Sequence, residues 1–266
     1  MPPGGEKRST LRDLDLERHV ADPDIKQRYV TAMFDLVAPR YDQFTRWFSY
    51  GLDRRWKGEL LAEAAARVVP GTVVLDVACG TGDLALGLRE LDAEITVVGL
   101  DPSGEMLAGC RRRGRAVDAA GPPSLHRGAA AVHLVRGDLM SLPAPASSVA
   151  MVTVGYGLRN VPDVAAALAE IGRVLRPDGW LLSLEFFRPA SMLGAALFLH
   201  YLRLAGRLYG WWWHREPNAY GYIAESVRRF LTRDEFRMAL ARAGFETIVS
   251  RRKLGGGIGL HVARRR

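Results

Sequence analysis

Short apolar runs and segments with a helical repeat take turns along the chain from residue 71 to residue 187. The runs have the length and the composition of strands that are buried on both faces of a sheet. Strands are expected at 71–78, 94–101, 131–138, 148–157 and 180–187, and helices at 82–91, 103–120 and 164–179. This alternation predicts an α/β fold with a doubly wound, mostly parallel sheet.

The pattern changes after residue 190. A helix with Thr232 as its N-cap and Gly244 at its C-terminal end is expected near the end of the chain. Two strand patterns follow within residues 246–265, and a run of three glycines joins them. This hairpin would bring the sheet to seven strands and make the last strand antiparallel.

The N-terminal part has a different character. Residues 1–23 lack the apolar stretch of a secretory signal and are expected to form a flexible polar leader. Residues 24–68 have a helical pattern that breaks near Pro39 and Gly51, and we expect a helical lid there. With 48% hydrophobic and 25% charged residues, residues 24–266 suit one folded domain.

Charge and cysteine content narrow the function classes. The net charge of +8 favours anionic partners, although much of the excess lies in local clusters such as 111–115 and 251–253. Zinc-finger spacing and a helix-turn-helix pattern are missing, so no nucleic-acid partner is expected. Cys79 and Cys110 make neither a disulfide framework nor a metal cluster, which fits a reducing, cytoplasmic setting and no metal site.

A glycine loop, "CGTGD", lies between the first expected strand and the helix that follows it. Gly80 and Gly82 allow the backbone to approach a ligand closely because neither carries a Cβ atom. The helix N-terminus offers free N–H groups to a carboxylate or phosphate. The loop also fits the loose dinucleotide pattern G-x-G-x-x-A, so a nicotinamide-dependent dehydrogenase remains an alternative at this point.

Three acidic residues accompany the glycine loop. Asp76, Asp101 and Asp138 each come at the end of an expected strand. Ligands of open α/β sheets bind in the crevice at the carboxyl ends of the strands, where a carboxylate can accept from ribose hydroxyls or an amino group. Each acid taken alone could instead be a helix N-cap or a turn residue, but three in this order indicate a nucleoside-binding crevice.

The glycine loop with "GLDPS" and "GDL" resembles the class I S-adenosylmethionine-dependent methyltransferases. That resemblance implies S-adenosylmethionine as cofactor and S-adenosylhomocysteine as product. It also implies that Gly80 and Thr81 lie by the methionine part of the cofactor. By the same resemblance, Asp101 lies by the ribose, and Asp138 with Leu139 lies by the adenine.

Longer segments resemble one subfamily, the ubiquinone/menaquinone biosynthesis C-methyltransferases of the UbiE type. The similar segments are 34–57, with a Y-D followed by R-x-W-K, then "YGLRNV" within 156–179, and "LLSLEFFRP" at 181–189. The resemblance covers about residues 28 to 263. It implies a demethylated quinol as acceptor, prenylated in this family. The sequence of residues 190–219 departs from the pattern of this family. The expected identity of the substrate therefore rests on the other segments.

The strand end "TVGYGLRN" carries the expected chemistry. A hydroquinone ring carbon becomes a nucleophile when its hydroxyl loses a proton, so the enzyme must remove that proton and stabilise the anion. Arg159, which is permanently charged, suits the anion, and Asn160 can hold a water molecule or the ring oxygen. Gly155 is expected close to the cofactor, and Tyr41 is a candidate lid contact.

Structural roles compete with these catalytic ones. Arg159 could form an ion pair with Asp163 or Asp42, and Tyr41 could be a packing aromatic. Glu185, in "LEFF", could hydrogen-bond the backbone in the crevice or take an active role. A water molecule relayed through Arg159 is the expected proton acceptor, because a guanidinium is a poor base.

An aromatic and basic segment at 197–213 ends in Trp211, Trp212 and Trp213. Two arginines and a histidine interrupt its apolar residues, so it is too short an apolar run to span a bilayer. It lies in an expected insertion at 190–225, which could be a lid, a homodimer contact or a peripheral membrane contact on the cytoplasmic face.

The sequence therefore predicts a C-methyltransferase of quinone biosynthesis. Two alternatives of the same fold are a methyltransferase with another small aromatic or lipid acceptor and a catalytically silent binding module. A dehydrogenase is less favoured, because it would lack the terminal hairpin and would need a second catalytic domain.

Overall fold

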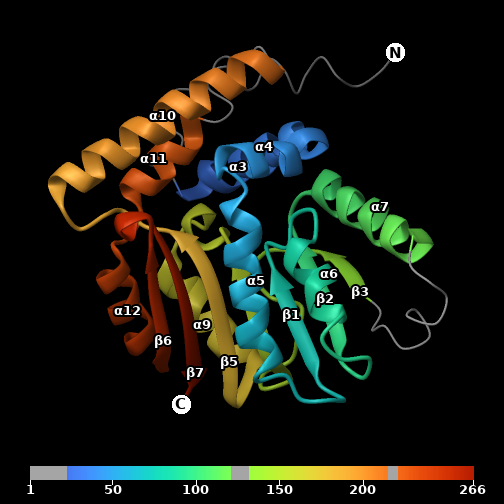
Figure 1. Ribbon diagram of the computed structural model, residues 1–266. Coiled ribbons are helices and arrows are strands. Elements are labelled where there is room, and N and C mark those ends of the chain that lie inside the picture. Colours follow the sequence, from blue (N-terminus) through green and yellow to red (C-terminus); the bar gives the residue numbers. More distant parts are fainter. Residues whose placement is uncertain (1–22, 121–131, 215–220) are drawn as a thin grey trace.

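Seven strands form one sheet in the computed structural model, which describes residues 23–120, 132–214 and 221–266 (Figure 1). The strands are β1 (Val73–Val77), β2 (Thr96–Asp101), β3 (Val132–Arg136), β4 (Val149–Gly155), β5 (Leu175–Phe186), β6 (Phe245–Lys253) and β7 (Ile258–Arg265). Their order is β3-β2-β1-β4-β5-β7-β6, and β7 runs antiparallel to both of its neighbours. The predicted doubly wound, seven-stranded fold with an antiparallel last strand is confirmed.

Helices cover both faces of the sheet. On one face lie α5 (Leu52–Ala65), α6 (Asp83–Arg89) and α7 (Gly104–Ala120), and on the other lie α9 (Val164–Val174) and α12 (Arg233–Arg242) (Figure 1). Apolar side chains of these helices pack on the alternate faces of β1, β4 and β5, of which β1, β4 and the second half of β5 are nearly fully buried. Burial on both faces explains why β1, β4 and the second half of β5 consist mainly of apolar residues.

Local sequence signals place the helix ends. Thr232 caps α12 as predicted, and its side chain and that of Glu235 form a reciprocal capping box. Helix α9 ends at Val174, earlier than the predicted end at residue 179, and β5 begins at the next residue. The difference has a physical reason, because Pro177 lacks an N–H donor and disfavours helical backbone in the residue before it.

A second layer of helices lies above the carboxyl ends of the strands (Figure 1). It contains α3 (Pro23–Val37), the short η1 (Ala38–Arg40), α4 (Tyr41–Phe48), α10 (Met192–His214) and α11 (Gly221–Arg229). These elements share two small apolar cores of their own. Of the predicted lid at 24–68, α3 and α4 lie in this upper layer, whereas α5 packs on the sheet.

The breaks in the N-terminal helices lie where the sequence predicts them. Pro39 lies in η1, and Gly51 adopts a φ of +77° immediately before α5, a conformation that favours glycine. The predicted leader at 1–23 lies almost entirely outside the described residues. Within the described part of the chain, no helix combines the length and apolarity that crossing a bilayer requires.

Candidate active site

The glycine loop connects β1 to α6 through three residues with positive φ, Ala78, Gly80 and Gly82. A Cβ atom at Gly80 would meet nothing within 4 Å, so this side of the loop is open. At Gly82 a Cβ atom would lie 2.2 Å from the sulfur of Cys110 in α7. Gly80 therefore leaves space for a ligand, whereas Gly82 permits close packing of the loop on α7.

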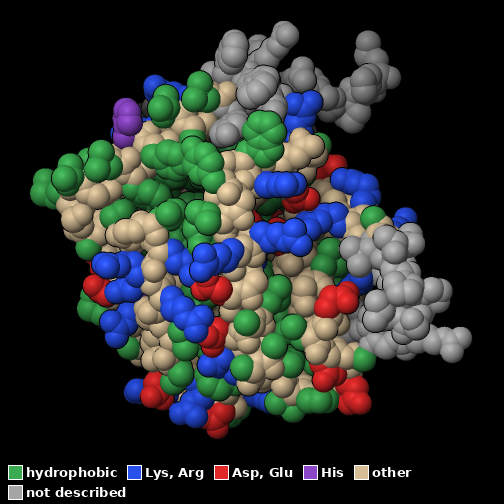
Figure 2. All heavy atoms as spheres, in the orientation of Figure 1, with side chains coloured by type: hydrophobic (Ala, Val, Ile, Leu, Met, Phe, Trp, Pro, Cys, Tyr) green, Lys and Arg blue, Asp and Glu red, His purple; other side chains and the backbone are tan. Residues whose placement is uncertain are grey.

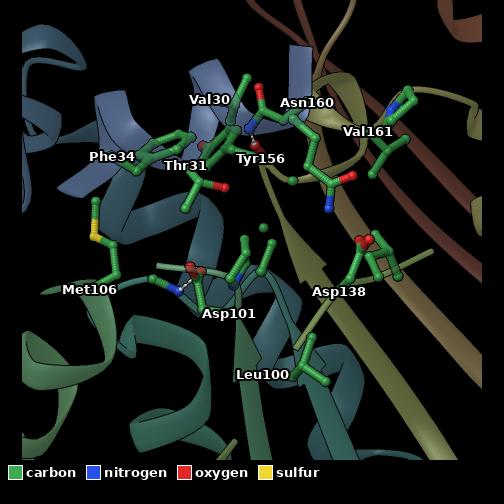
Figure 3. Close-up of a pocket in the computed structure, with 18 of the residues that line it drawn as sticks. Val30, Thr31, Phe34, Leu100, Asp101, Met106, Asp138, Tyr156, Asn160 and Val161 are labelled. Carbon is green, nitrogen blue, oxygen red and sulfur yellow. Dashed lines mark hydrogen bonds between the residues drawn. The ribbon is translucent and has the colours of Figure 1, made fainter. Parts of the chain in front are cut away.

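A first cavity lies between this loop and α3 (Figure 3). Its wall includes seven of the residues singled out in the sequence: Tyr41, Gly80, Asp101, Asp138, Leu139, Gly155 and Asn160. In Figure 3, Asp101 and Asp138 lie across the cavity from Val30, Thr31 and Phe34 of α3. The sequence did not indicate these three, because their spacing is that of any amphipathic helix.

Asp101 holds the glycine loop and borders the cavity. One carboxylate oxygen accepts a hydrogen bond from the backbone N–H of Gly80 at 2.8 Å, and the other accepts from that of Ser103 at 2.9 Å. Burial raises the pKa of Asp101 to about 6, although these two hydrogen bonds act in the opposite direction and lower it. The carboxylate is thus ionised at neutral pH and retains lone pairs for ligand hydroxyls. Asp138 accepts from the backbone of Met140 at 2.9 Å.

Asp76 near the end of β1 and Thr81 within the glycine loop are not part of the wall of the first cavity. Parallel pairing of β1 with β4 sets Asp76 next to Thr153, whose hydroxyl donates to it at 2.7 Å. Burial raises the pKa of Asp76 to about 7. The hydroxyl of Thr81 donates to Asp42 at 2.5 Å. Asp76 therefore joins β1 to β4 beneath the loop, and Thr81 joins the loop to α4.

A second cavity adjoins the first and shares Phe34, Tyr41 and Tyr156 with it. Most of its wall is apolar and comes from α3, α4, α5 and α11, together with Phe186 at the end of β5. Two charged side chains also line it, Arg159 and Asp53. The two cavities are therefore neighbours, and Tyr41 and Tyr156 contribute to the walls of both.

Arg159 pairs with Glu185, and not with Asp163 or Asp42 as considered from the sequence. Its Nη1 atom donates to Glu185 at 2.8 Å and to the carbonyl of Tyr156 at 2.5 Å. Asp163 instead caps α9 through the N–H groups of Ala165 and Ala166, and Asp42 pairs with Thr81 and Arg113. The cause is topological, because β4 and β5 are adjacent and their carboxyl ends meet.

The guanidinium of Arg159 keeps one donor free. The residue is 5% exposed, and among the described residues none accepts a hydrogen bond from its buried Nε atom. Its charged end lies 5.0 Å from the centre of the Phe186 ring. A buried donor without a partner costs free energy, so this position favours an acceptor atom supplied by a ligand.

Residues of the upper helices hold the strand end that carries Arg159 and Asn160. The hydroxyl of Tyr222, in α11, donates to Asn160 at 3.1 Å, and Asn160 donates to the carbonyl of Tyr156 at 3.2 Å. Lys26 of α3 donates to the carbonyl of Arg159 at 3.1 Å and to that of Val161 at 2.6 Å. Nothing in the sequence indicated Lys26 or Tyr222, since these contacts join segments far apart in the chain.

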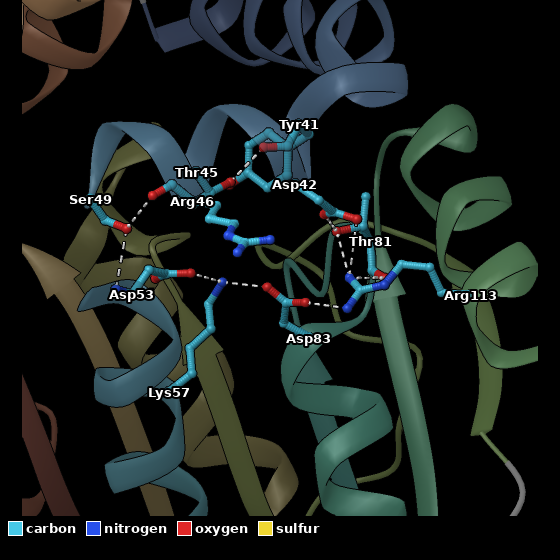
Figure 4. A network of polar contacts seen from close by, with 10 residues as sticks. All are labelled: Tyr41, Asp42, Thr45, Arg46, Ser49, Asp53, Lys57, Thr81, Asp83 and Arg113. Atoms are coloured by element: carbon cyan, nitrogen blue, oxygen red, sulfur yellow. Dashed lines mark hydrogen bonds and ion pairs between the residues drawn. The ribbon is translucent and has the colours of Figure 1, made fainter. Parts of the chain in front are cut away.

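A polar network fastens α4 to the glycine loop (Figure 4). Arg113 of α7 forms ion pairs with Asp83 at 2.6 Å and Asp42 at 3.4 Å, and it also donates to Thr81. Burial opposes ionisation of Asp83, but Lys57 and Arg113 hold its pKa below the usual value. Ion pairs and hydrogen bonds therefore connect the glycine loop to α4 of the upper layer.

Lys57 extends the network to the second cavity. It lies 2.7 Å from Asp53 and 2.6 Å from Asp83, and it is largely buried (Figure 4). Burial alone would lower the pKa of Lys57, but the two carboxylates raise it above its usual value. Lys57 therefore stays charged and holds Asp53 at the wall of the second cavity.

Comparison with known proteins gives a consistent result. The model of the ubiE/COQ5 methyltransferase family matches residues 23–265. The ubiquinone/menaquinone biosynthesis C-methyltransferase UbiE of Rubrivivax gelatinosus is 36% identical over 223 residues, which is 84% of this chain and 81% of that protein. The demethylmenaquinone methyltransferase of Deinococcus radiodurans is 37% identical over 228 residues, 86% of this chain and 89% of that protein.

A solved structure supports the fold. The magnesium protoporphyrin IX methyltransferase of Synechocystis PCC 6803, determined with bound SAH, superposes with a TM-score of 0.63 at 17% identity. The match covers 92% of this chain and 100% of that one. At this identity the likeness concerns the arrangement of strands and helices.

Proposed function

Because the chain belongs to the ubiE/COQ5 methyltransferase family, we propose that it methylates a ring carbon of a demethylated quinol in quinone biosynthesis. The resemblance drawn from the sequence is confirmed, and so is the expectation of a methyltransferase. The acceptor is demethylmenaquinol or a demethylated ubiquinol precursor. The observation that carries the proposal is the buried, partly unpaired guanidinium of Arg159 in an apolar cavity beside the cofactor-type cavity.

The first cavity fits S-adenosylmethionine as the cofactor of this chain. The open side of Gly80 leaves space by the glycine loop, and the ionised Asp101 can accept from ribose hydroxyls. Asp138 and Leu139 border the part of the cavity that we assign to adenine. When bound, the cofactor supplies a methyl group on a positively charged sulfur. The chain's own contribution is to align the two ligands and exclude water.

Arg159 stabilises the anion of the acceptor. A guanidinium keeps its charge at all accessible pH values, so it can hold a phenolate oxygen throughout the reaction. Burial raises the pKa of Tyr41 to about 12, and burial together with nearby Asp53 raises the pKa of Tyr156 well above its usual value. Both phenols are protonated at neutral pH, so they can donate hydrogen bonds but cannot act as the base.

Asp53 is the proton acceptor that we propose. It is the carboxylate in the wall of the second cavity, where it lies beside the phenol of Tyr156. The water relay through Arg159 that the sequence suggested would then end on Asp53. Lys57, 2.7 Å away, keeps this carboxylate in place.

The test is a methyl-transfer assay with both quinols, together with calorimetry of S-adenosylhomocysteine and NADH. We expect S-adenosylhomocysteine to bind and NADH not to bind, and at least one quinol to be methylated.

Arg159→Lys keeps a cation beside Glu185 and should retain cofactor affinity while turnover falls about 100-fold. Asp53→Asn should lose turnover at pH 7 and recover it at alkaline pH, where the acceptor ionises unaided.

Two results would contradict the proposal. Failure to bind S-adenosylhomocysteine would remove the cofactor assignment. Methylation of a different small aromatic or lipid acceptor, with neither quinol used, would favour the alternative methyltransferase. A dehydrogenase is disfavoured by the antiparallel β7.

The exposed face of α10 supports a peripheral membrane contact. Leu193, Leu197, Leu204 and Leu208 are each more than half exposed and recur at helical spacing along one stripe. Arg203 and Arg207, also exposed, border this stripe and suit anionic headgroups. The side chains of Trp211 to Trp213 lie outside the described residues.

Cytoplasmic location and the homodimer remain predictions, which cell fractionation and sedimentation velocity would test.

A further inference from the structure

An apolar groove continues from the second cavity toward the surface. It shares Phe48, Ser49, Trp56 and Phe186 with that cavity and has a volume of about 400 Å³. Its walls come from the α4–α5 junction, the end of β5, α10, and the segment from η4 (Leu254–Gly256) to β7. The first cavity, the second cavity and the groove therefore form one continuous series.

Two rows of aromatic rings line this series. One row runs from Tyr156 to Phe186 and on to Phe198, with ring centres 5.0 Å and 6.3 Å apart. The second row runs from Phe44 to Phe48 and on to Tyr201, with ring centres 5.0 Å and 5.8 Å apart. Phe198 and Tyr201, the last rings of the two rows, both belong to α10, and both rows pass from the second cavity into the groove.

Two hydroxyl groups in the wall of the groove already have partners. The hydroxyl of Tyr201 donates to the carbonyl of Phe48 at 2.7 Å. The hydroxyl of Ser49 accepts from the backbone N–H of Asp53 at 3.3 Å and donates to the carbonyl of Arg46 at 3.4 Å. A ligand in this groove therefore meets hydrocarbon and ring faces, which suits an apolar chain and does not suit a polar one.

We propose that the groove binds the isoprenoid chain of the acceptor, with the quinol ring in the second cavity. This inference rests on the proposed function and adds a subsite to it. The second cavity meets the first at Tyr41 and Tyr156 and meets the groove at Phe48 and Trp56. A ring that presents a carbon to the cofactor at one end can thus extend its side chain into the groove at the other.

The outer end of the groove opens at exposed apolar residues. Tyr50 is 80% exposed, Leu197 64% and Leu254 49%, and all three line the groove. Figure 2 shows hydrophobic side chains gathered over α10 and in the hollow beneath it, with Lys and Arg side chains along the border below. A chain longer than the groove would leave the protein over this apolar surface.

The test varies the length of the acceptor chain in the absence of vesicles. The acceptors are demethylated naphthoquinols with no side chain and with one, two or three isoprene units. Each methylene group that leaves water improves binding about fourfold, so KM of the wild type should fall at least about tenfold from no side chain to two units. In Leu197→Asp/Leu254→Asp that gain should be lost, while KM for the acceptor without a side chain stays within about twofold.

Leu204→Asp is the matched control, because Leu204 lies on the same helix at 54% exposure and does not line the groove. We expect it to leave the chain-length dependence unchanged. Binding of farnesol, measured by tryptophan fluorescence, tests the groove without any reaction and should weaken about tenfold in the double variant only. Equal farnesol binding by all three proteins, or a wild-type KM independent of chain length, would overturn the groove assignment. Farnesol binding without methylation of any quinol would overturn the proposed function alone.

Discussion

Asp76 and Asp101 show how much the surroundings of a single carboxylate matter. Both lie near the carboxyl ends of neighbouring strands, and burial raises the pKa of each. Asp101 borders the first cavity and accepts two backbone hydrogen bonds, whereas Asp76 lies beneath the loop with Thr153 as its side-chain donor. One oxygen of Asp76 is buried and has no hydrogen-bond partner in the described chain.

The raised pKa of Asp76 predicts a contribution to stability that depends on pH. Its pKa is about 7 in the folded protein and about 3.9 in an unfolded chain, so between these values the folded state holds a proton that the unfolded state has lost. The contribution is complete below pH 4 and is lost as the pH rises through 7. We expect Asp76→Asn, measured by urea unfolding, to lose less stability than the wild type between pH 5 and pH 8.

Asp178→Asn is the control for this titration. Asp178 is exposed and has a φ of +61°, which asparagine tolerates well. Its substitution should leave the pH dependence of the unfolding free energy unchanged. Each unit by which the pKa of Asp76 is raised corresponds to about 1.4 kcal/mol, so an equal slope for Asp76→Asn and wild type would contradict the assignment.

Residue-scale reasoning from the sequence identified Arg159 but not its partner. The strand-end position indicated a buried guanidinium in need of an anion, whereas Glu185 was considered for a backbone hydrogen bond or an active role and not as the partner of Arg159. The pair forms because β4 and β5 are hydrogen-bonded neighbours, which places side chains 26 positions apart in contact. Strand order across the sheet decides such a pairing, and no local signal carries it.

At the scale of elements, α4 and the glycine loop are joined through α7. Arg113 bridges Asp42 on α4 and Asp83 at the start of α6, and it also donates to Thr81 (Figure 4). These groups are partly exposed, so the ion pairs should contribute only about 0.5–1 kcal/mol to global stability. Their larger effect is expected on the position of the upper layer over the first cavity.

Arg113→Met removes this bridge while keeping much of the side-chain volume. We expect the affinity for S-adenosylhomocysteine, measured by calorimetry, to fall about three- to tenfold, with the urea midpoint nearly unchanged. Weaker cofactor binding follows because α4 and the loop are no longer held together around the cavity.

Arg112→Met is the matched control on the same helix. Arg112 is exposed and is not part of the network in Figure 4. Its substitution removes the same charge from the surface and should leave cofactor affinity within about twofold, since surface charges contribute little individually. If both variants lost affinity equally, the effect would come from net charge and not from the bridge.

At the scale of the whole molecule, the apolar stripe of α10 lies on the outside of the upper layer, next to the mouth of the groove. If this face contacts a membrane, the groove opens toward the phase where a prenylated quinol is dissolved. We expect co-sedimentation with vesicles that contain anionic lipid, weakened by salt, because arginines near such a surface contribute about 1 kcal/mol each.

Leu204→Asp/Leu208→Asp should reduce vesicle binding at least about tenfold. Met238→Asp is the control, because Met238 is 51% exposed but lies on α12, which covers the sheet. Equal binding by the wild type and the α10 variant would show that this stripe does not contact lipid.

The arrangement of the sheet was largely predictable, whereas the upper layer was not. Alternating strand and helix patterns predicted the parallel part, and the glycines near residue 256 predicted the hairpin of β6 and β7. The same helical periodicity over 24–68, however, describes α3 and α4 above the strands and α5 on the sheet. Periodicity reports that one face of a helix is buried, but not which partner buries it.

The sequence alone determined the fold and the family, and it indicated several residues that line the first cavity, because these depend on local patterns and on short motifs at strand ends. Tertiary structure decided the Arg159–Glu185 pair, the supports from Lys26 and Tyr222, and the groove that continues from the second cavity. Each of these joins side chains from elements far apart in the chain. Such contacts arise from how the upper helices pack over the strand ends, which no local pattern encodes.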